Sequence, residues 1–177
     1  MPLVVAVFYI LAFGKLEWSG FSFILLYFSG ALIRIASRRV NFEHTRLREI
    51  SAPKLILTGV YSVSRNPLYV SNLCIIFAFL TFNSDLTENL IIMAILMVHY
   101  QIIALTERDF LIQKFAQNYF NWAKTTPFWI GLFKYVPCPN IRALKTTLLQ
   151  DFWTWFFHFL ILGLFICKIT FYSSYTI

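Results

Sequence analysis

The segment "SRNPLYVSNLCIIFAFLTFNSDLTENLIIMAILMVHYQIIAL", residues 64–105, contains two apolar runs separated by a short polar turn. The runs cover residues 68–82 and 90–105, and "NSDLTEN" joins them. Apolar runs approaching about 20 residues are typical of helices that cross a bilayer. The first run is short, so its helix must thin the membrane locally or extend into the preceding turn. The segment therefore predicts a membrane-embedded helical hairpin with a polar cluster where its first helix begins.

The whole chain has the composition of a membrane protein. Of its 177 residues, 59% are hydrophobic and only 13% are charged, whereas about 25% charged residues is usual in a soluble domain. Further apolar runs at residues 2–13, 19–36 and 152–171 bring the predicted spans to five. No basic segment precedes the first run, so we expect a retained span rather than a cleaved signal. The predicted fold is an all-α, polytopic membrane helix bundle forming a single domain over residues 1–177.

The basic residues predict the topology of this bundle. Thirteen of the fifteen Lys and Arg residues fall within residues 34–65 and 108–145, and the net charge is +7. Positively charged loops stay cytoplasmic and attract anionic lipid headgroups. We therefore expect a cytoplasmic N-terminus and cytoplasmic basic segments, with the Asp85–Glu88 loop and the C-terminus on the opposite side. This distribution explains the charge without any binding of nucleic acid.

The polar region before the last span is predicted to contain a cytoplasmic amphipathic helix. It should run to about Lys124 and end before Pro127, because proline cannot continue a helix. One face of this helix carries Glu107, Leu111, Lys114, Phe115, Asn118 and Trp122. A helix lying on the bilayer surface is one interpretation. It leaves unexplained why Glu107 stands in an apolar stripe, where a carboxylate is costly unless it is paired.

The polar cluster before the third span has the features of an anion-binding turn. Gly59 permits a turn, and Pro67 disfavours helical geometry at Asn66, so the helix must begin after Asn66. Free amides near residues 68–70 would then form a positive helix end suited to carboxylate or phosphate. Arg65 adds a permanently charged planar group beside that end. The alternative interpretation is an arginine that anchors the chain to headgroups, with interfacial tyrosines.

Two sequence motifs resemble a known family. The first, "GVYSVSRNPLYVS" at residues 59–71, resembles the G-P-Y-x-x-x-R-H-P-x-Y-x-G signature of membrane methyltransferases, which include isoprenylcysteine carboxyl methyltransferase and phospholipid N-methyltransferases. Their second signature is E-E-x-x-L-x-x-x-F-G-x-x-Y-x-x-Y followed by proline. The residues in that register here are Glu107, Arg108, Leu111, Phe115, Ala116, Tyr119, Trp122 and Pro127. The resemblance covers residues 34–127, and the span at residues 152–171 lies outside it.

The resemblance implies an S-adenosylmethionine-dependent methyltransferase acting on a membrane lipid or prenylated acceptor at the cytoplasmic face. It assigns catalysis to Arg65 and places the cofactor among a set of residues from both motifs. These are Arg65, Asn66, Pro67, Leu68, Tyr69, Glu107 and Leu111. Asn66 stands where the family has histidine and cannot titrate. That change slightly favours carboxylate or phosphate O-methylation over amine N-methylation, since an anionic acceptor needs no base.

Polar residues inside the fourth span are candidates for the acceptor site. Intramembrane polar groups are often functional, so His99 and Gln101, together with Tyr61, are predicted to bind substrate. Simple hydrogen bonding between helices is the other interpretation of His99 and Gln101. The histidines are too scattered for a metal site, and none is predicted.

Two other function classes stay open from the sequence. A membrane sterol or enone reductase using NADPH shares a similar R-H-P-x-Y stretch. A non-catalytic membrane scaffold of the same fold would explain the altered motif positions, among them Arg108 in place of the second glutamate. The sequence carries no signal for the oligomeric state.

Overall fold

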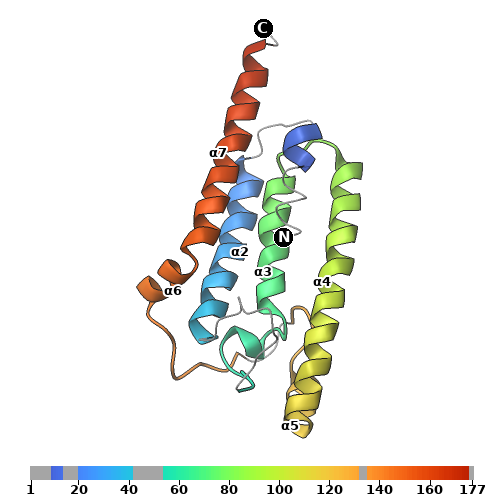
Figure 1. Ribbon diagram of the computed structural model, residues 1–177, viewed down its shortest axis with the longest axis vertical. Helices are drawn as coiled ribbons and strands as arrows, with labels where there is room; N and C mark the ends of the chain where they lie inside the picture. Colours follow the sequence, from blue (N-terminus) through green and yellow to red (C-terminus); the bar gives the residue numbers. More distant parts are fainter. Residues whose placement is uncertain (1–8, 14–19, 42–53, 132–134, 176–177) are drawn as a thin grey trace.

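The computed structural model describes residues 9–13, 20–41, 54–131 and 135–175, and its elements there are helices (Figure 1). The long helices lie side by side and are α2 (Gly20–Val40), α3 (Pro67–Leu80), α4 (Leu86–Phe115) and α7 (Phe152–Tyr175). The short ones are η1 (Val60–Ser62), α5 (Gln117–Thr125) and α6 (Leu144–Gln150). We call the end of the bundle formed by the last turns of α2 and α4, the first turn of α3, η1 and α5 the basic end. The predicted all-α fold is confirmed.

Within the described part of the chain, three helices are long and apolar enough to cross a membrane: Gly20–Val40, Leu86–Phe115 and Phe152–Phe171. Helix α3 is also apolar but has only 14 residues. These four helices correspond to the last four predicted spans. Of the first predicted span, only residues 9–13 are described, and they are helical. The protein is therefore an integral membrane protein, and the count of five spans stays a prediction.

Both helices of the α3–α4 hairpin begin where the residue type suits the start of a helix. Helix α3 starts at Pro67, which suits a first helical position because no backbone amide is needed there. The turn ends at Asp85, whose carboxylate accepts a 3.0 Å hydrogen bond from the Glu88 amide and caps α4. The predicted hairpin is confirmed, and it sets the first turn of α3 beside the last turns of α4.

The predicted amphipathic segment is divided between two helices. Helix α4 continues without interruption to Phe115, because no glycine or proline stands between Leu105 and that residue. The break comes at Ala116, which has a positive φ of 42°, and α5 follows. Glu107 thus lies on α4 itself, rigidly placed against α3, instead of on a separate surface helix.

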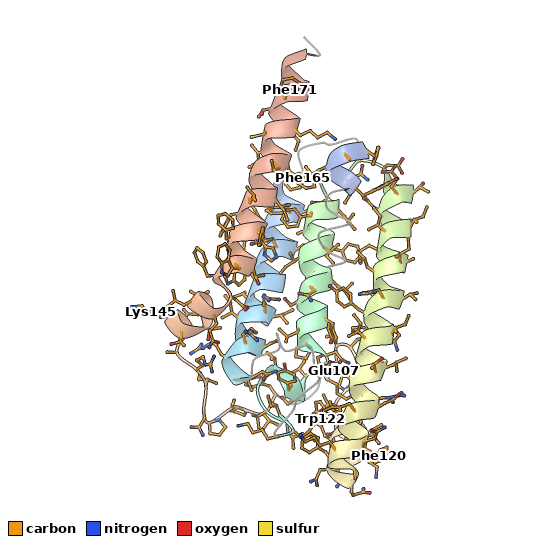
Figure 2. The ribbon with its side chains drawn as sticks, in the orientation of Figure 1. Glu107, Phe120, Trp122, Lys145, Phe165 and Phe171 are labelled. Atoms are coloured by element: carbon orange, nitrogen blue, oxygen red, sulfur yellow. The ribbon has the colours of Figure 1, made fainter. Side chains whose placement is uncertain are left out.

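Close packing of α2, α3 and α7 holds the frame around the basic end. The Ser71 hydroxyl donates a 2.9 Å hydrogen bond to the Gly30 carbonyl, so α2 and α3 approach closely. A Cβ atom added to Gly30 would lie 2.8 Å from Ile75 Cγ1. On the other side, the Phe165 ring of α7 lies 5.7 Å from that of Phe79 and 5.3 Å from that of Phe82 (Figure 2).

Candidate functional site

A cavity of about 380 Å³ lies at the basic end. Its volume falls within the range of small-molecule sites, about 300–1,000 Å³. Both sequence motifs line it, since residues 65–69 come from the start of α3 and Glu107 from the last turns of α4 (Figure 2). Its described charged residues are five cations and one carboxylate: Arg34, Arg38, Lys54, Arg65, Arg108 and Glu107. Cations thus outnumber carboxylates among the described lining residues, and Glu107 is the carboxylate among them.

Arg65 is held by the chain that follows α5. Its backbone amide donates a 3.0 Å hydrogen bond to the Pro127 carbonyl, and its guanidinium lies over the Phe128 ring at 5.2 Å. One guanidinium nitrogen, Nη1, donates to the Tyr119 hydroxyl at 3.3 Å. The buried Nε atom has no hydrogen-bond partner among the described residues. Arg65, which lines the cavity, is thus held in place by the Pro127–Phe128 segment and by Tyr119.

Asn66 has a structural role at the start of α3. Its side-chain Nδ2 donates a 2.9 Å hydrogen bond to the Phe128 carbonyl. Its carbonyl accepts from the amides of Tyr69 and Val70, each at 3.1 Å. The prediction of free amides at residues 68–70 is therefore wrong for two of the three. The first turn closes on the Asn66 carbonyl, and the arginines supply the positive character of the site.

Glu107 is paired across the hairpin. The Tyr69 hydroxyl donates a 2.9 Å hydrogen bond to Glu107 Oε2, which joins α3 to α4 at the cavity wall. The neighbouring Arg108 instead pairs with Asp109 at 2.8 Å on the exposed surface. A carboxylate on an otherwise apolar face is thus satisfied by a partner and directed into the cavity.

Tyr61 of η1 also lines the cavity. Its carbonyl accepts a 3.0 Å hydrogen bond from Trp122 Nε1, and its hydroxyl is hydrogen-bonded to Asn41. Burial raises the pKa of the Tyr61 phenol to about 12. The group therefore stays protonated at neutral pH and can act as a hydrogen-bond donor in the cavity.

Two arginines are among the cavity residues that the sequence analysis did not identify as site residues. Arg34 and Arg38 project from the last turns of α2, and both bind Asp151, whose side chain is 3% exposed. Two arginines four positions apart near the end of a membrane helix share one face. That spacing is the available sequence signal, but basic residues at the end of a membrane helix equally mark its cytoplasmic side.

The predicted cofactor residues meet at this cavity, whereas two of the predicted acceptor residues do not. All seven of the former line it: Arg65, Asn66, Pro67, Leu68, Tyr69, Glu107 and Leu111. His99 is exposed on α4 and Gln101 is half-buried, and neither is among the described residues that line the cavity. The structure thus shows where these residues lie, and their roles in binding cofactor and acceptor stay predictions.

A membrane helix bundle with a basic, small-molecule-sized cavity between these two motifs defines the class of the protein. The family model described as phospholipid methyltransferase matches residues 18–118, more than half of the chain. The chain belongs to the phospholipid methyltransferase family and is thereby classed among the membrane methyltransferases. Comparisons with curated proteins and with solved structures found no match.

Proposed function

We propose that the protein is an S-adenosylmethionine-dependent methyltransferase acting on a lipid or lipidated acceptor, with its site at the cytoplasmic membrane face. The observation that carries this proposal is that residues of both motifs line one cavity. A hydrogen bond from Tyr69 to Glu107 links the two motifs at its wall. Family membership supports methyl transfer, and the basic flanks of the cavity support a cytoplasmic position.

The residues present fit this cofactor. S-adenosylmethionine carries an ammonium and a carboxylate, and when bound it would supply an electrophilic methyl group on a sulfonium. Glu107 offers the negative group that would pair with the ammonium or accept from a ribose hydroxyl. Arg65, which lines the cavity, offers a permanent positive charge for an anionic oxygen. Asn66, Pro67, Leu68, Tyr69 and Leu111 form the remaining predicted wall.

A second, wider hollow supports a separate path for the acceptor. This groove of about 1180 Å³ runs along α5 and shares Arg65, Trp122, Lys54 and Leu55 with the cavity. Arg65 therefore lies on the boundary between the two spaces. We assign the acceptor to the groove and to Tyr61, and leave out His99 and Gln101 because neither lines either space.

Methyl transfer to an anionic acceptor at this boundary needs little acid–base catalysis. An acceptor oxygen would attack the methyl carbon as the carbon–sulfur bond breaks, and this single in-line displacement depends on alignment and exclusion of water. A carboxylate or phosphate acceptor loses no proton, which suits a site with Asn66 in place of a titratable histidine. Arg65 would orient the acceptor anion, and the Phe128 and Trp122 rings would exclude water.

The proposal is tested by calorimetric titration of the purified protein with S-adenosylmethionine and, separately, with NADPH in the same detergent. We expect binding of S-adenosylmethionine and none of NADPH. Binding of NADPH alone would favour the reductase alternative. Binding of neither, by protein that unfolds cooperatively on heating, would favour the scaffold alternative and overturn the proposal.

A further inference from the structure

A buried carboxylate from the C-terminal helices reaches the wall of the cavity. Asp151 stands between α6 and α7 and is 2% exposed. Its Oδ2 atom accepts a 3.0 Å bond from Arg34 Nε, and its Oδ1 atom lies 3.3 Å from Arg38 Nε. The Asp151 carboxylate thus contacts two arginines of α2, each through a different oxygen. Both arginines also line the cavity.

Side chains from several helices hold Arg34 in place. Arg34 Nη1 donates to Asn72 Oδ1 of α3 at 3.2 Å, and Arg34 Nη2 donates to Thr154 Oγ1 of α7 at 3.5 Å. Asn72 is in turn hydrogen-bonded to Tyr100 of α4. A network that joins four helices holds its side chains in one geometry, so little ordering is required when a ligand binds.

The partner of these arginines comes from outside the family match. Residues 18–118 include α2, whereas α6 and α7 lie beyond them. Helix α7 is itself locked in place, because the Tyr27 hydroxyl and His158 Nδ1 lie 3.3 Å apart, and Phe165 packs on α3. The C-terminal helices therefore contribute to the site as well as to the membrane anchor.

The charges of the cavity indicate what this wall would bind. Glu107 is the single carboxylate among the described lining residues, and it is engaged with Tyr69 on the α3–α4 side. Arg34 and Arg38 line the cavity from α2, and the half-buried Asn72 lines it from α3. Planar guanidinium groups in fixed positions suit carboxylate and phosphate oxygens. A ligand with a positive group at one end and an anionic group at the other would match both walls.

We propose that Arg34 and Arg38 form an anion-binding wall of the cavity and that Asp151 is the positioning residue that sets it. This inference rests on the proposed function. The bound group is a carboxylate or phosphate, supplied either by the amino-acid end of the cofactor or by the headgroup of the acceptor. The network makes the C-terminal helices part of the binding site.

The test compares ligands that differ only in the anionic group. Affinities are measured by calorimetry on the full chain in detergent for S-adenosylmethionine and for its decarboxylated analogue. A second arm uses nanodiscs containing phosphatidic acid and others containing only phosphatidylcholine. The variants are Arg38→Gln and Asp151→Asn. The matched control is Arg39→Gln, on the same turn of α2, whose Nε instead donates to the Arg142 carbonyl at 2.9 Å.

We expect Arg38→Gln to weaken binding of one anionic ligand by at least about tenfold, as for a lost charge-assisted bond. The matched ligand without the anion should bind equally to both proteins, and Arg39→Gln should change neither. Loss in the S-adenosylmethionine arm assigns the wall to the cofactor, and loss in the phosphatidic acid arm assigns it to the acceptor. Asp151→Asn should reduce the same preference, with a smaller effect on the ligand that lacks the anion.

Equal preference for the anionic ligand in wild type and Arg38→Gln, in both arms, would overturn the inference. If Asp151→Asn does not fold, Arg38→Lys replaces it, because lysine keeps the charge and loses the planar fork. Unchanged anion preference in Arg38→Lys and Arg38→Gln would equally overturn the inference. Failure of the wild type to bind S-adenosylmethionine would reject the proposed function, whereas the phosphatidic acid arm would still decide on the anion-binding wall.

Discussion

The hydroxyl of Tyr69 donates a 2.9 Å hydrogen bond to Glu107 Oε2, across the two helices of the α3–α4 hairpin. The two residues are 38 positions apart, and each belongs to a different sequence motif. Their contact converts two separate motifs into one wall of the cavity. It also satisfies a carboxylate that would otherwise be an expensive group on an apolar face.

Glu107→Gln tests whether this carboxylate serves a ligand. Glutamine keeps the volume but removes the charge, so S-adenosylmethionine affinity should fall by about 1.5–3 kcal/mol, roughly ten- to hundredfold. The measurement is calorimetry in detergent. Asp109→Asn is the control, because Asp109 is exposed and pairs with Arg108 at the surface, where ion pairs contribute little. Equal affinities in the two variants would exclude Glu107 as a cofactor ligand.

Tyr69→Phe separates positioning from charge at the same pair. It removes the hydroxyl that orients Glu107 and leaves the carboxylate in place. If Tyr69 acts through Glu107, the double variant with Glu107→Gln should be no weaker than Glu107→Gln alone, because the two losses are not additive within one network. Additive losses in S-adenosylmethionine affinity would show that Tyr69 contacts the ligand independently.

Arg65→Lys tests the planar group at the boundary between cavity and groove. Lysine cannot both stack on Phe128 and donate to Tyr119 as the guanidinium does. Methyl transfer should fall at least about tenfold, which corresponds to about 1.4 kcal/mol, while thermal unfolding stays unchanged. Arg39→Lys is the control, since Arg39 is not among the described cavity residues. Full activity in Arg65→Lys would return Arg65 to a headgroup-anchoring role.

Cysteine labelling tests the proposed topology. In a chain without its three natural cysteines, Ser84→Cys should react with an impermeant reagent from outside, and Asn121→Cys only after permeabilisation. Both positions are exposed, and they lie at opposite ends of α4, in the turn before it and in α5 beyond it. Labelling of both from the same side would contradict a spanning α4 and the proposed cytoplasmic position of the site.

Gly30→Ala tests the close approach of α2 and α3. The added methyl group would lie 2.8 Å from Ile75 Cγ1, so overpacking should lower the free energy of unfolding by about 1–3 kcal/mol. Gly163→Ala is the matched control on α7, where an added Cβ meets nothing within 4 Å. Thermal unfolding in one detergent compares the two. A melting temperature for Gly30→Ala at or above that of the wild type would contradict this packing.

The local features of the chain determined much of this protein. Apolar runs predict where helices cross the membrane, because only helices satisfy their own backbone there. Pro67 and Asp85 predict the ends of the hairpin, since both act within one helical turn. The two motifs predict the candidate site, and the seven predicted cofactor residues all line one cavity: Arg65, Asn66, Pro67, Leu68, Tyr69, Glu107 and Leu111.

Tertiary structure alone decided the rest. The position of the Phe128 ring beside the Arg65 guanidinium depends on packing between segments far apart in the sequence, which helical periodicity does not encode. In the sequence, Arg34 and Arg38 look like any other basic residues near a membrane interface, which indicate topology. Only the approach of Asp151, more than 110 positions later in the chain, distinguishes them as a cavity wall. A buried charged side chain requires a partner of opposite charge, and the fold brings Asp151 into that position beside Arg34 and Arg38.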